Sequence, residues 1–293
     1  MIVITGGDGQ LGRAVVTALR NRIDLANFAV SVRDADKAAD LAADGIAVRG
    51  GGDYSDVDSM ARAFDGARTA LIISGNSPVE VRQQQQRNAV DGAKRAGVQR
   101  IVYTSVLDAD APNSPFPFTT VHRDTEAYLA DSGVVHTIAR HTAYAELNLL
   151  FAKGALATGK LSMPTGDGRV AFATRTDLAN ALAVLLATDD HAEQLYKLTG
   201  PVAYAYADVA TALSESVGRT IPHDDCSPEA YAAGLSAAGL PPFLVKGMVG
   251  MAEAVRQGLY SEVSQDIRLL TGQPADDGLT ILRRVAPSLI QPV

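Results

Sequence analysis

The chain has 293 residues, of which 47% are hydrophobic and 20% charged, with a formal net charge of −7 at pH 7. This composition is ordinary for a soluble globular protein and suffices for one large α/β domain, alone or with a second lobe. The acidic balance argues against binding to nucleic acid or to an anionic membrane surface, since both need basic patches.

The single cysteine, Cys226, excludes an intramolecular disulfide and fits a reducing compartment. The first residues enter an apolar run without the basic start and long apolar core of a secretion signal. No apolar run approaches the ~20 residues that a membrane-spanning helix needs. We therefore expect a cytoplasmic protein that binds neither membrane nor nucleic acid.

The strongest motif lies at the start of the chain. Residues 2–4 form a β-branched run typical of a buried parallel strand, and residues 13–22 predict an amphipathic helix. Between them the glycines are spaced Gly6-x-x-Gly9-x-x-Gly12. In this order they indicate dinucleotide binding, because they permit the tight turn, the approach of a pyrophosphate and close packing of the helix. The alternative is a tight turn that binds no ligand.

The second predicted strand, residues 28–32, ends in Arg33, twenty-one residues after the last of these glycines. An acid at such a position binds the ribose 2′-hydroxyl of NAD, whereas an arginine suits a 2′-phosphate. Arg33 therefore predicts NADP, with Lys37 as a second nearby cation. Asp34 keeps NAD open, and the other interpretation of Arg33 is a solvated loop residue.

Strands and helices continue to alternate along the next hundred residues. Further strands are predicted over 46–49, 69–73, 100–105 and 134–139, and helices over 55–64, 79–96 and 118–132. This order predicts a doubly wound parallel sheet of the Rossmann type with right-handed crossovers. Such sheets bind ligands at the carboxyl ends of their strands. We expect cofactor contacts from Asp53, Ser74, Gly75, Thr104 and Ser105, although plain turns would also explain the first three.

The regular alternation ends after Arg140. Helices are predicted up to about residue 158 and over 178–188, 206–217, 228–238 and 242–257, with short strands within 159–172 and one over 195–198. We predict an NADP-binding domain over 1–142, to which 170–198 returns, and a smaller, mostly helical substrate-binding lobe over 143–293. The polar loop 106–117 is expected to border the pocket.

The spacing Gly6-x-x-Gly9-x-x-Gly12 resembles that of short-chain dehydrogenase/reductase folds. Short-chain reductases usually carry Tyr-x-x-x-Lys, in which the lysine lowers the pKa of a proton-donating tyrosine. None of the nine tyrosines has a lysine four residues later. If Glu126 marks the usual register, Phe118 takes the tyrosine position and His122 the lysine position, and phenylalanine donates no proton. Tyr144, His141, His122 or water remain as proton donors, with packing roles as the alternatives for the tyrosine and His122.

No metal-site spacing is present, and the sequence His223-Asp224-Asp225-Cys226 is interpreted as a polar loop. The motifs together resemble the NmrA-like, atypical short-chain dehydrogenase/reductase family, especially its type 2 NAD(P)H:quinone oxidoreductases and triphenylmethane reductases. The matching stretches are Ile4-Thr5-Gly6-x-x-Gly9-Gln10-Leu11-Gly12, Val32-Arg33, Gly52-Asp53-Tyr54, Tyr103-Thr104-Ser105, His122-x-x-Thr125-Glu126, Ala173-Thr174-Arg175 and Leu270-Thr271-Gly272.

The resemblance implies NADPH bound by Arg33 and by the glycine turn, with neither flavin nor metal. The implied turn residues are Thr5, Gly6, Gly9, Gln10, Leu11 and Gly12. Two departures stand out: the turn reads Gly7-Asp8 where relatives usually have Ala-Thr, and His141 follows Arg140 where quinone reductases tend to have Arg-Asn-Gly.

The predicted function is an NADPH-dependent reductase that transfers hydride to a conjugated, electron-poor small molecule such as a quinone, enone or iminium-like carbon. Such acceptors spread the incoming charge, so a strong acid matters less, and positioning of the reactants supplies much of the rate. The alternative is a regulator that senses NADP(H) and binds a protein partner without turnover. The expected assembly is a monomer or homodimer.

Overall fold

The computed structural model describes residues 1–289. The chain divides into two compact units. Unit 1 consists of Met1–Ala109, Thr120–His141 and Leu178–Lys197, and unit 2 of Asp110–Thr119, Thr142–Asp177 and the chain from Leu198 onward. The expected first domain, 1–142, included residues 110–119, but this segment groups with unit 2. The segment that returns to unit 1 was expected over 170–198 and spans Leu178–Lys197.

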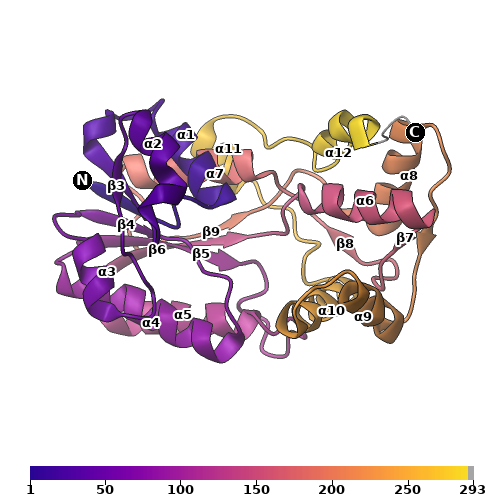
Figure 1. Ribbon diagram of the computed structural model, residues 1–293, viewed down its shortest axis with the longest axis horizontal. Helices are drawn as coiled ribbons and strands as arrows, with labels where there is room; N and C mark the ends of the chain where they lie inside the picture. Colours follow the sequence, from indigo (N-terminus) through magenta and orange to yellow (C-terminus); the bar gives the residue numbers. More distant parts are fainter. Residues whose placement is uncertain (290–293) are drawn as a thin grey trace. The chain divides into compact units, whose positions relative to one another are not determined.

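Unit 1 is built on a seven-stranded sheet in the order β3-β2-β1-β4-β5-β6-β9 (Figure 1). The strands are β1 (Ile2–Thr5), β2 (Phe28–Ser31), β3 (Ala47–Arg49), β4 (Thr69–Ile72), β5 (Arg100–Val106), β6 (Val135–His141) and β9 (Leu195–Leu198). Neighbours from β3 to β6 pair in parallel. The order 3-2-1-4-5-6 is the dinucleotide-binding arrangement, so the predicted doubly wound sheet is confirmed.

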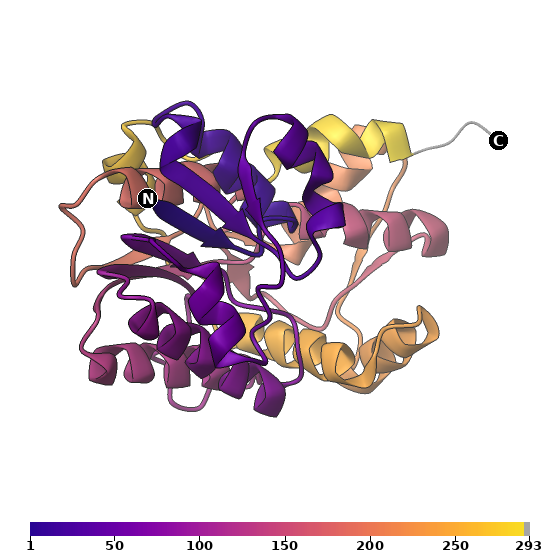
Figure 2. The same cartoon turned by 60° about the vertical axis from the view of Figure 1, so that its left-hand side comes forward.

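Helices cover both faces of this sheet. One face carries α1 (Gln10–Leu19), α2 (Ala39–Ala43) and α7 (Arg175–Ala187), whose body from Leu178 belongs to unit 1. The other face carries α3 (Val57–Ala63), α4 (Val79–Arg95) and α5 (Thr119–Ser132), and Figure 2 shows the same layers after rotation. Short 3₁₀ turns complete the unit: η1 (Leu25–Asn27) and η2 (Ala35–Ala38).

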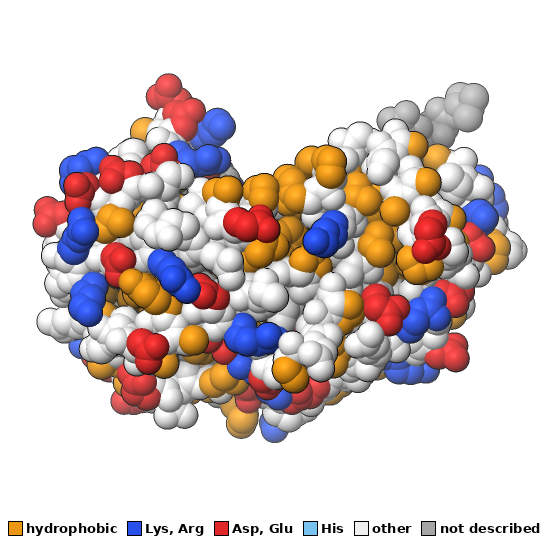
Figure 3. All heavy atoms as spheres, turned by 90° about the horizontal axis from the view of Figure 1, so that it is seen from below, with side chains coloured by type: hydrophobic (Ala, Val, Ile, Leu, Met, Phe, Trp, Pro, Cys, Tyr) orange, Lys and Arg blue, Asp and Glu red, His pale blue; other side chains and the backbone are white. Residues whose placement is uncertain are grey.

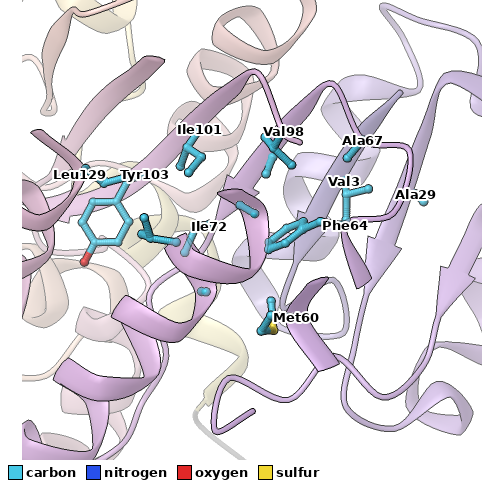
Figure 4. Close-up of a cluster of buried hydrophobic side chains, with 14 of the residues drawn as sticks. Val3, Ala29, Met60, Phe64, Ala67, Ile72, Val98, Ile101, Tyr103 and Leu129 are labelled. Atoms are coloured by element: carbon cyan, nitrogen blue, oxygen red, sulfur yellow. The ribbon is translucent and has the colours of Figure 1, made fainter. Parts of the chain in front are cut away.

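A continuous apolar core lies between the sheet and the face carrying α3, α4 and α5 (Figure 4). Met60 of α3, Phe64 directly after this helix and Leu129 of α5 are fully buried there with strand residues such as Val3 and Tyr103. Burial of such large side chains stabilises a fold by about 1.5–3 kcal/mol each. This core fixes the strand ends that carry the site.

Unit 2 is mostly helical. Its helices are α6 (Leu147–Thr158), α8 (Tyr206–Val217), α9 (Pro228–Ala237), α10 (Pro242–Arg256), α11 (Asp266–Thr271) and α12 (Thr280–Val285), followed by η3 (Ala286–Leu289). β8 (Arg169–Val170) pairs antiparallel with β10 (Tyr204–Ala205), and β7 (Leu161–Ser162) pairs in parallel with β11 (His223–Asp224).

The proline-bearing segment 110–119 packs closely on α10. A Cβ added to Gly247 would lie 2.6 Å from Cε2 of Phe118, and one added to Gly250 would lie 2.3 Å from the carbonyl oxygen of Pro115. The two glycines therefore provide space for the segment, which explains why it groups with unit 2. Its predicted place at the border of a pocket stays a prediction.

Charged side chains of both signs are interspersed over the face shown in Figure 3, and neither sign covers an extended area there. Ion pairs on the surface of unit 1 include Arg20 with Asp44 and Arg95 with Asp58. Among the described helices, none combines the length and the apolar character that crossing a bilayer requires.

Candidate nucleotide-binding site

A cavity of about 460 Å³ lies within unit 1, where β1, β2, β3 and β4 end. Its walls come from the glycine turn, the end of β2, the loops after β3 and β4, and α4. The lining residues are Gly6, Asp8, Gly9, Ser31, Val32, Arg33, Gly52, Asp53, Tyr54, Ile73, Ser74, Gly75, Asn76, Ser77 and Gln85. The carboxyl edge of the sheet therefore forms the site, as the strand order predicts.

The glycine turn brings the start of α1 to this cavity. Gly6 has a φ of +61°, which only glycine adopts readily, and a Cβ on Gly12 would lie 2.2 Å from the carbonyl oxygen of Gly6. The helix begins after Gly9 without a side-chain cap. Its first N–H groups have no partner within the helix, so they and the helix dipole suit an anion such as a pyrophosphate.

Arg33 is the only lysine or arginine among the residues that line the cavity. Its side chain is exposed, and it has no hydrogen bond or ion pair to other side chains or backbone groups within residues 1–289. The guanidinium of Arg13 is instead engaged by the carbonyls of Asp8 and Lys37 and by the carboxylate of Asp40. Arg33 is thus the cation available to a 2′-phosphate.

Tyr54 connects the loop after β3 to residues at the ends of β1 and β4. Its hydroxyl lies 2.9 Å from the carbonyl oxygen of Ile73 and 2.5 Å from Oγ1 of Thr5, and burial raises its pKa. Thr5 also donates to the carbonyl of Leu71 and accepts from the N–H of Ile73. Thr5 therefore joins β1 to β4 below the cavity and does not line it.

Thr104 and Ser105 stand at the end of β5, but neither lines this cavity. Thr104 accepts a hydrogen bond from the N–H of Ser74 at 3.0 Å. Ser105 donates to Glu126 Oε1 at 2.5 Å, and both oxygens of Glu126 also accept from Arg140, at 3.0 and 2.7 Å. Both hydroxyls thus have structural partners, and their predicted contacts with the cofactor stay predictions.

His122 is 4% exposed and lies between Arg82 and Tyr103. Its Nε2 is 3.1 Å from Nη2 of Arg82, and its Nδ1 is 2.9 Å from the hydroxyl of Tyr103. Burial first, and the charge of Arg82 second, lower the pKa of His122 well below its usual range. A neutral His122 accepts from Arg82, which in turn donates to the hydroxyl of Ser74 on the cavity wall. His122 is thus linked to the cavity wall through Arg82.

The other two predicted proton donors also lie outside the lining of the cavity. His141 ends β6 and is 3% exposed, and burial lowers its pKa to about 3. Tyr144 belongs to unit 2, where the guanidinium of Arg175 lies 4.5 Å from the centre of its ring and pairs with Glu146 at 3.2 Å. A catalytic role for any of the three stays a prediction.

The structure thus brings together the glycine turn, Arg33, Asp53, Ser74 and Gly75. The sequence analysis did not include Asp8, Asn76, Ser77 and Gln85 among the site residues. The position of the first three just after strands β1 and β4 was a usable signal, whereas Gln85 lies within α4 and had none. Gln10, Leu11 and Gly12 form the first turn of α1 and offer backbone N–H groups. Among residues 1–289, no group of three or more His, Cys, Asp or Glu side chains could hold a metal ion.

Comparison with known proteins agrees with this geometry. The model of the NAD(P)H-binding family matches residues 6–189. Quinone oxidoreductase 2 of Escherichia coli is 36% identical over 274 residues, 94% of each chain, and the NAD(P)H azoreductase of Xenophilus azovorans is 28% identical over 275 residues, again 94% of each.

Solved structures show the same similarity along almost the whole chain. The Escherichia coli NADPH-dependent quinone oxidoreductase in complex with NADPH superimposes with a TM-score of 0.92 at 35% identity, covering 97% of this chain and 99% of that one. The Citrobacter sp. triphenylmethane reductase in complex with NADP(H) gives 0.88 at 28% identity, covering 99% of both. The chain belongs to the NAD(P)H-binding family, and its predicted place among the NmrA-like, atypical short-chain dehydrogenases/reductases, as an NAD(P)H-dependent oxidoreductase, is confirmed.

Proposed function

We propose that this protein is an NADPH-dependent reductase that transfers hydride to a conjugated, electron-poor small molecule. The observation that carries the proposal is the free guanidinium of Arg33, which lines the same cavity as the uncapped start of α1. Similar proteins are named for quinones, azo compounds and triphenylmethane dyes, all of them conjugated acceptors. A quinone, an enone or an iminium-like carbon is the proposed acceptor class.

Bound NADPH supplies the hydride. The first N–H groups of α1 would hold its pyrophosphate, and Arg33 would hold its 2′-phosphate. A firmly held donor brings the reacting carbons together, and such positioning is worth several kcal/mol of the barrier. Neither flavin nor metal is part of the proposal.

The proposed reaction proceeds without a Tyr-Lys pair, since no tyrosine is followed by lysine four residues later. With a pKa of about 3, His141 is neutral near pH 7 and holds no proton to donate as an imidazolium. Burial also lowers the pKa of His122, whose Nε2 lies against Arg82, so water or Tyr144 is the proposed source of the remaining proton. A positioned acid typically raises the reaction rate ~10²–10⁴-fold. The rate would therefore depend on Tyr144 to this extent if Tyr144 is the donor, and hardly at all if water is.

The test compares Arg33→Ala with the unchanged protein in binding titrations of NADPH and NADH. Losing a charged hydrogen bond costs about 1.5–3 kcal/mol, so NADPH should weaken about 10–100-fold and NADH hardly at all. Arg20→Ala is the matched control, because Arg20 pairs with Asp44 on the surface and does not line the cavity. An equal loss for both cofactors would contradict the 2′-phosphate role.

Turnover is measured alongside as NADPH oxidation at about 340 nm with quinones, enones, cationic dyes and cyclic imines. Turnover with one of these classes supports the proposed acceptor. Tight NADPH binding without turnover of any acceptor would contradict the reductase and favour a sensor that binds NADP(H) and a protein partner.

A further inference from the structure

The glycine turn places a carboxylate in the cavity that contains Arg33. Asp8 lines this cavity, and its side chain is half-buried. No hydrogen bond or ion pair engages its carboxylate within residues 1–289, although Arg13 lies close enough to interact with it electrostatically. Asp8 and Arg33 thus line the cavity from the ends of two adjacent strands, and the other carboxylate of the lining, Asp53, accepts a hydrogen bond from the N–H of Ser55.

The position of Asp8 is fixed by the backbone around it. Its carbonyl accepts a hydrogen bond from Nε of Arg13 at 3.1 Å. The preceding Gly7 is pressed against β2, since a Cβ there would lie 2.4 Å from Cβ of Val30. Thr5 at the end of β1 pairs with Ser31 at the end of β2. Asp8 stands three residues beyond the first strand and Arg33 two beyond the second, so both flank the same edge.

This edge is where a Rossmann sheet receives the adenine ribose, whose 2′ position is the only difference between NADH and NADPH. We propose that Asp8 opposes Arg33 at this position and admits NADH to the site. Its carboxylate accepts a hydrogen bond from the 2′-hydroxyl of NADH and repels the 2′-phosphate of NADPH. The inference rests on the proposed function only in taking NAD(P)H as the ligand of this cavity.

The expected size of the effect follows from the charges. A phosphate monoester carries about −1.5 to −2 at pH 7, and a carboxylate that lines the same solvated cavity weakens its binding by up to about tenfold. The preference for NADPH that Arg33 creates is then reduced by the same factor. Because the repulsion crosses solvent, it should shrink as ionic strength rises.

The experiment measures dissociation constants of NADPH and NADH for the full chain and for Asp8→Asn, which keeps the shape and removes the charge. We expect NADPH to bind up to about tenfold tighter and NADH to bind equally or a few-fold more weakly. Asp8→Ser should shift the ratio in the same direction, and it guards against a folding defect in the first variant. Asp36→Asn is the control, because Asp36 is exposed nearby but does not line the cavity, and its ratio should stay within twofold.

An NADPH-to-NADH ratio unchanged in both Asp8 variants, with binding intact, would overturn the proposal while the reductase function still stands. A shifted ratio in a protein that reduces no acceptor would leave the role of Asp8 supported and refute the reductase instead. Binding titrations without an acceptor thus separate the two.

Discussion

The ion pair between Glu126 and Arg140 permits a quantitative test of how unit 1 is held together. Glu126 of α5 accepts hydrogen bonds from both Arg140 of β6 and Ser105 of β5. The side chain of Arg140 is only 8% exposed and that of Glu126 16%. Removal of one partner from a buried pair leaves an uncompensated charge and costs about 3–5 kcal/mol.

Glu126→Ala should therefore reduce the free energy of unfolding by about 3–5 kcal/mol, a large part of the ~5–15 kcal/mol of a typical domain. Glu126→Gln retains an acceptor for Arg140 and Ser105, so it should cost less, about 1.5–3 kcal/mol. The double variant Glu126→Met with Arg140→Met removes both charges but leaves the buried hydroxyl of Ser105 without its acceptor, so it should cost about 1–3 kcal/mol, less than Glu126→Ala.

The assay is urea unfolding followed by circular dichroism, with the free energies of Glu126→Met, Arg140→Met and the double variant combined in a double-mutant cycle. The arrangement predicts a coupling energy of several kcal/mol. The reasoning is refuted if Glu126→Ala costs under about 1 kcal/mol, or if the double variant is as unstable as Glu126→Ala alone.

Three further outcomes follow from other residues. Since burial lowers the pKa of His141 to about 3, the unfolded chain binds a proton at His141 between pH 6.5 and 3 that the folded chain does not. This difference should leave the free energy of unfolding unaffected above pH 6.5 and reduce it by about 4 kcal/mol at pH 3.5. His141→Gln should remove this contribution, as measured by urea unfolding at each pH. Gly12→Ala should abolish the binding of both cofactors through its clash with the carbonyl of Gly6, whereas Gly154→Ala in α6, where a Cβ meets nothing within 4 Å, should raise stability by about 0.5–1 kcal/mol. Asn148 is fully buried, and neither amide atom has a partner among the described residues, so Asn148→Leu should leave the melting temperature unchanged or higher, and a clear drop would show that the amide is paired in solution.

Local patterns predicted the sheet and most helices because apolar strand runs and glycine-terminated helices are short-range signals. Gly97 and Gly133, both with positive φ, end α4 and α5 as expected. The start of α1 was predicted at residue 13, whereas the helix begins at Gln10, because three glycines conceal its first turn. Gly12 lies within this first turn, and the close approach of the Gly6 carbonyl explains why the position carries no side chain.

Long-range contacts explain what the sequence did not reveal. No local pattern shows that segment 110–119 packs on Gly247 and Gly250, which lie more than a hundred residues later. The partner of Ser105 is likewise on another element, so its hydroxyl looked available to a ligand. Arg33 and the glycines were predictable because their places follow from the strand order, and Asp8 lies in the same turn, although only the cavity shows that its side chain lines the site.

The return of Leu178–Lys197 to unit 1 affects how the protein forms during synthesis. The sheet ends in β9, which joins β6 only after the intervening Thr142–Asp177 has been made. A nascent chain that has reached residue 142 therefore exposes β6 as an open edge and lacks the helix α7 over one face. Such edges pair readily with other chains. Unit 1 is complete only after about two thirds of the polypeptide has left the ribosome. A fragment ending at residue 142 should therefore aggregate, whereas one continuing to Leu198 would contain every strand of the sheet.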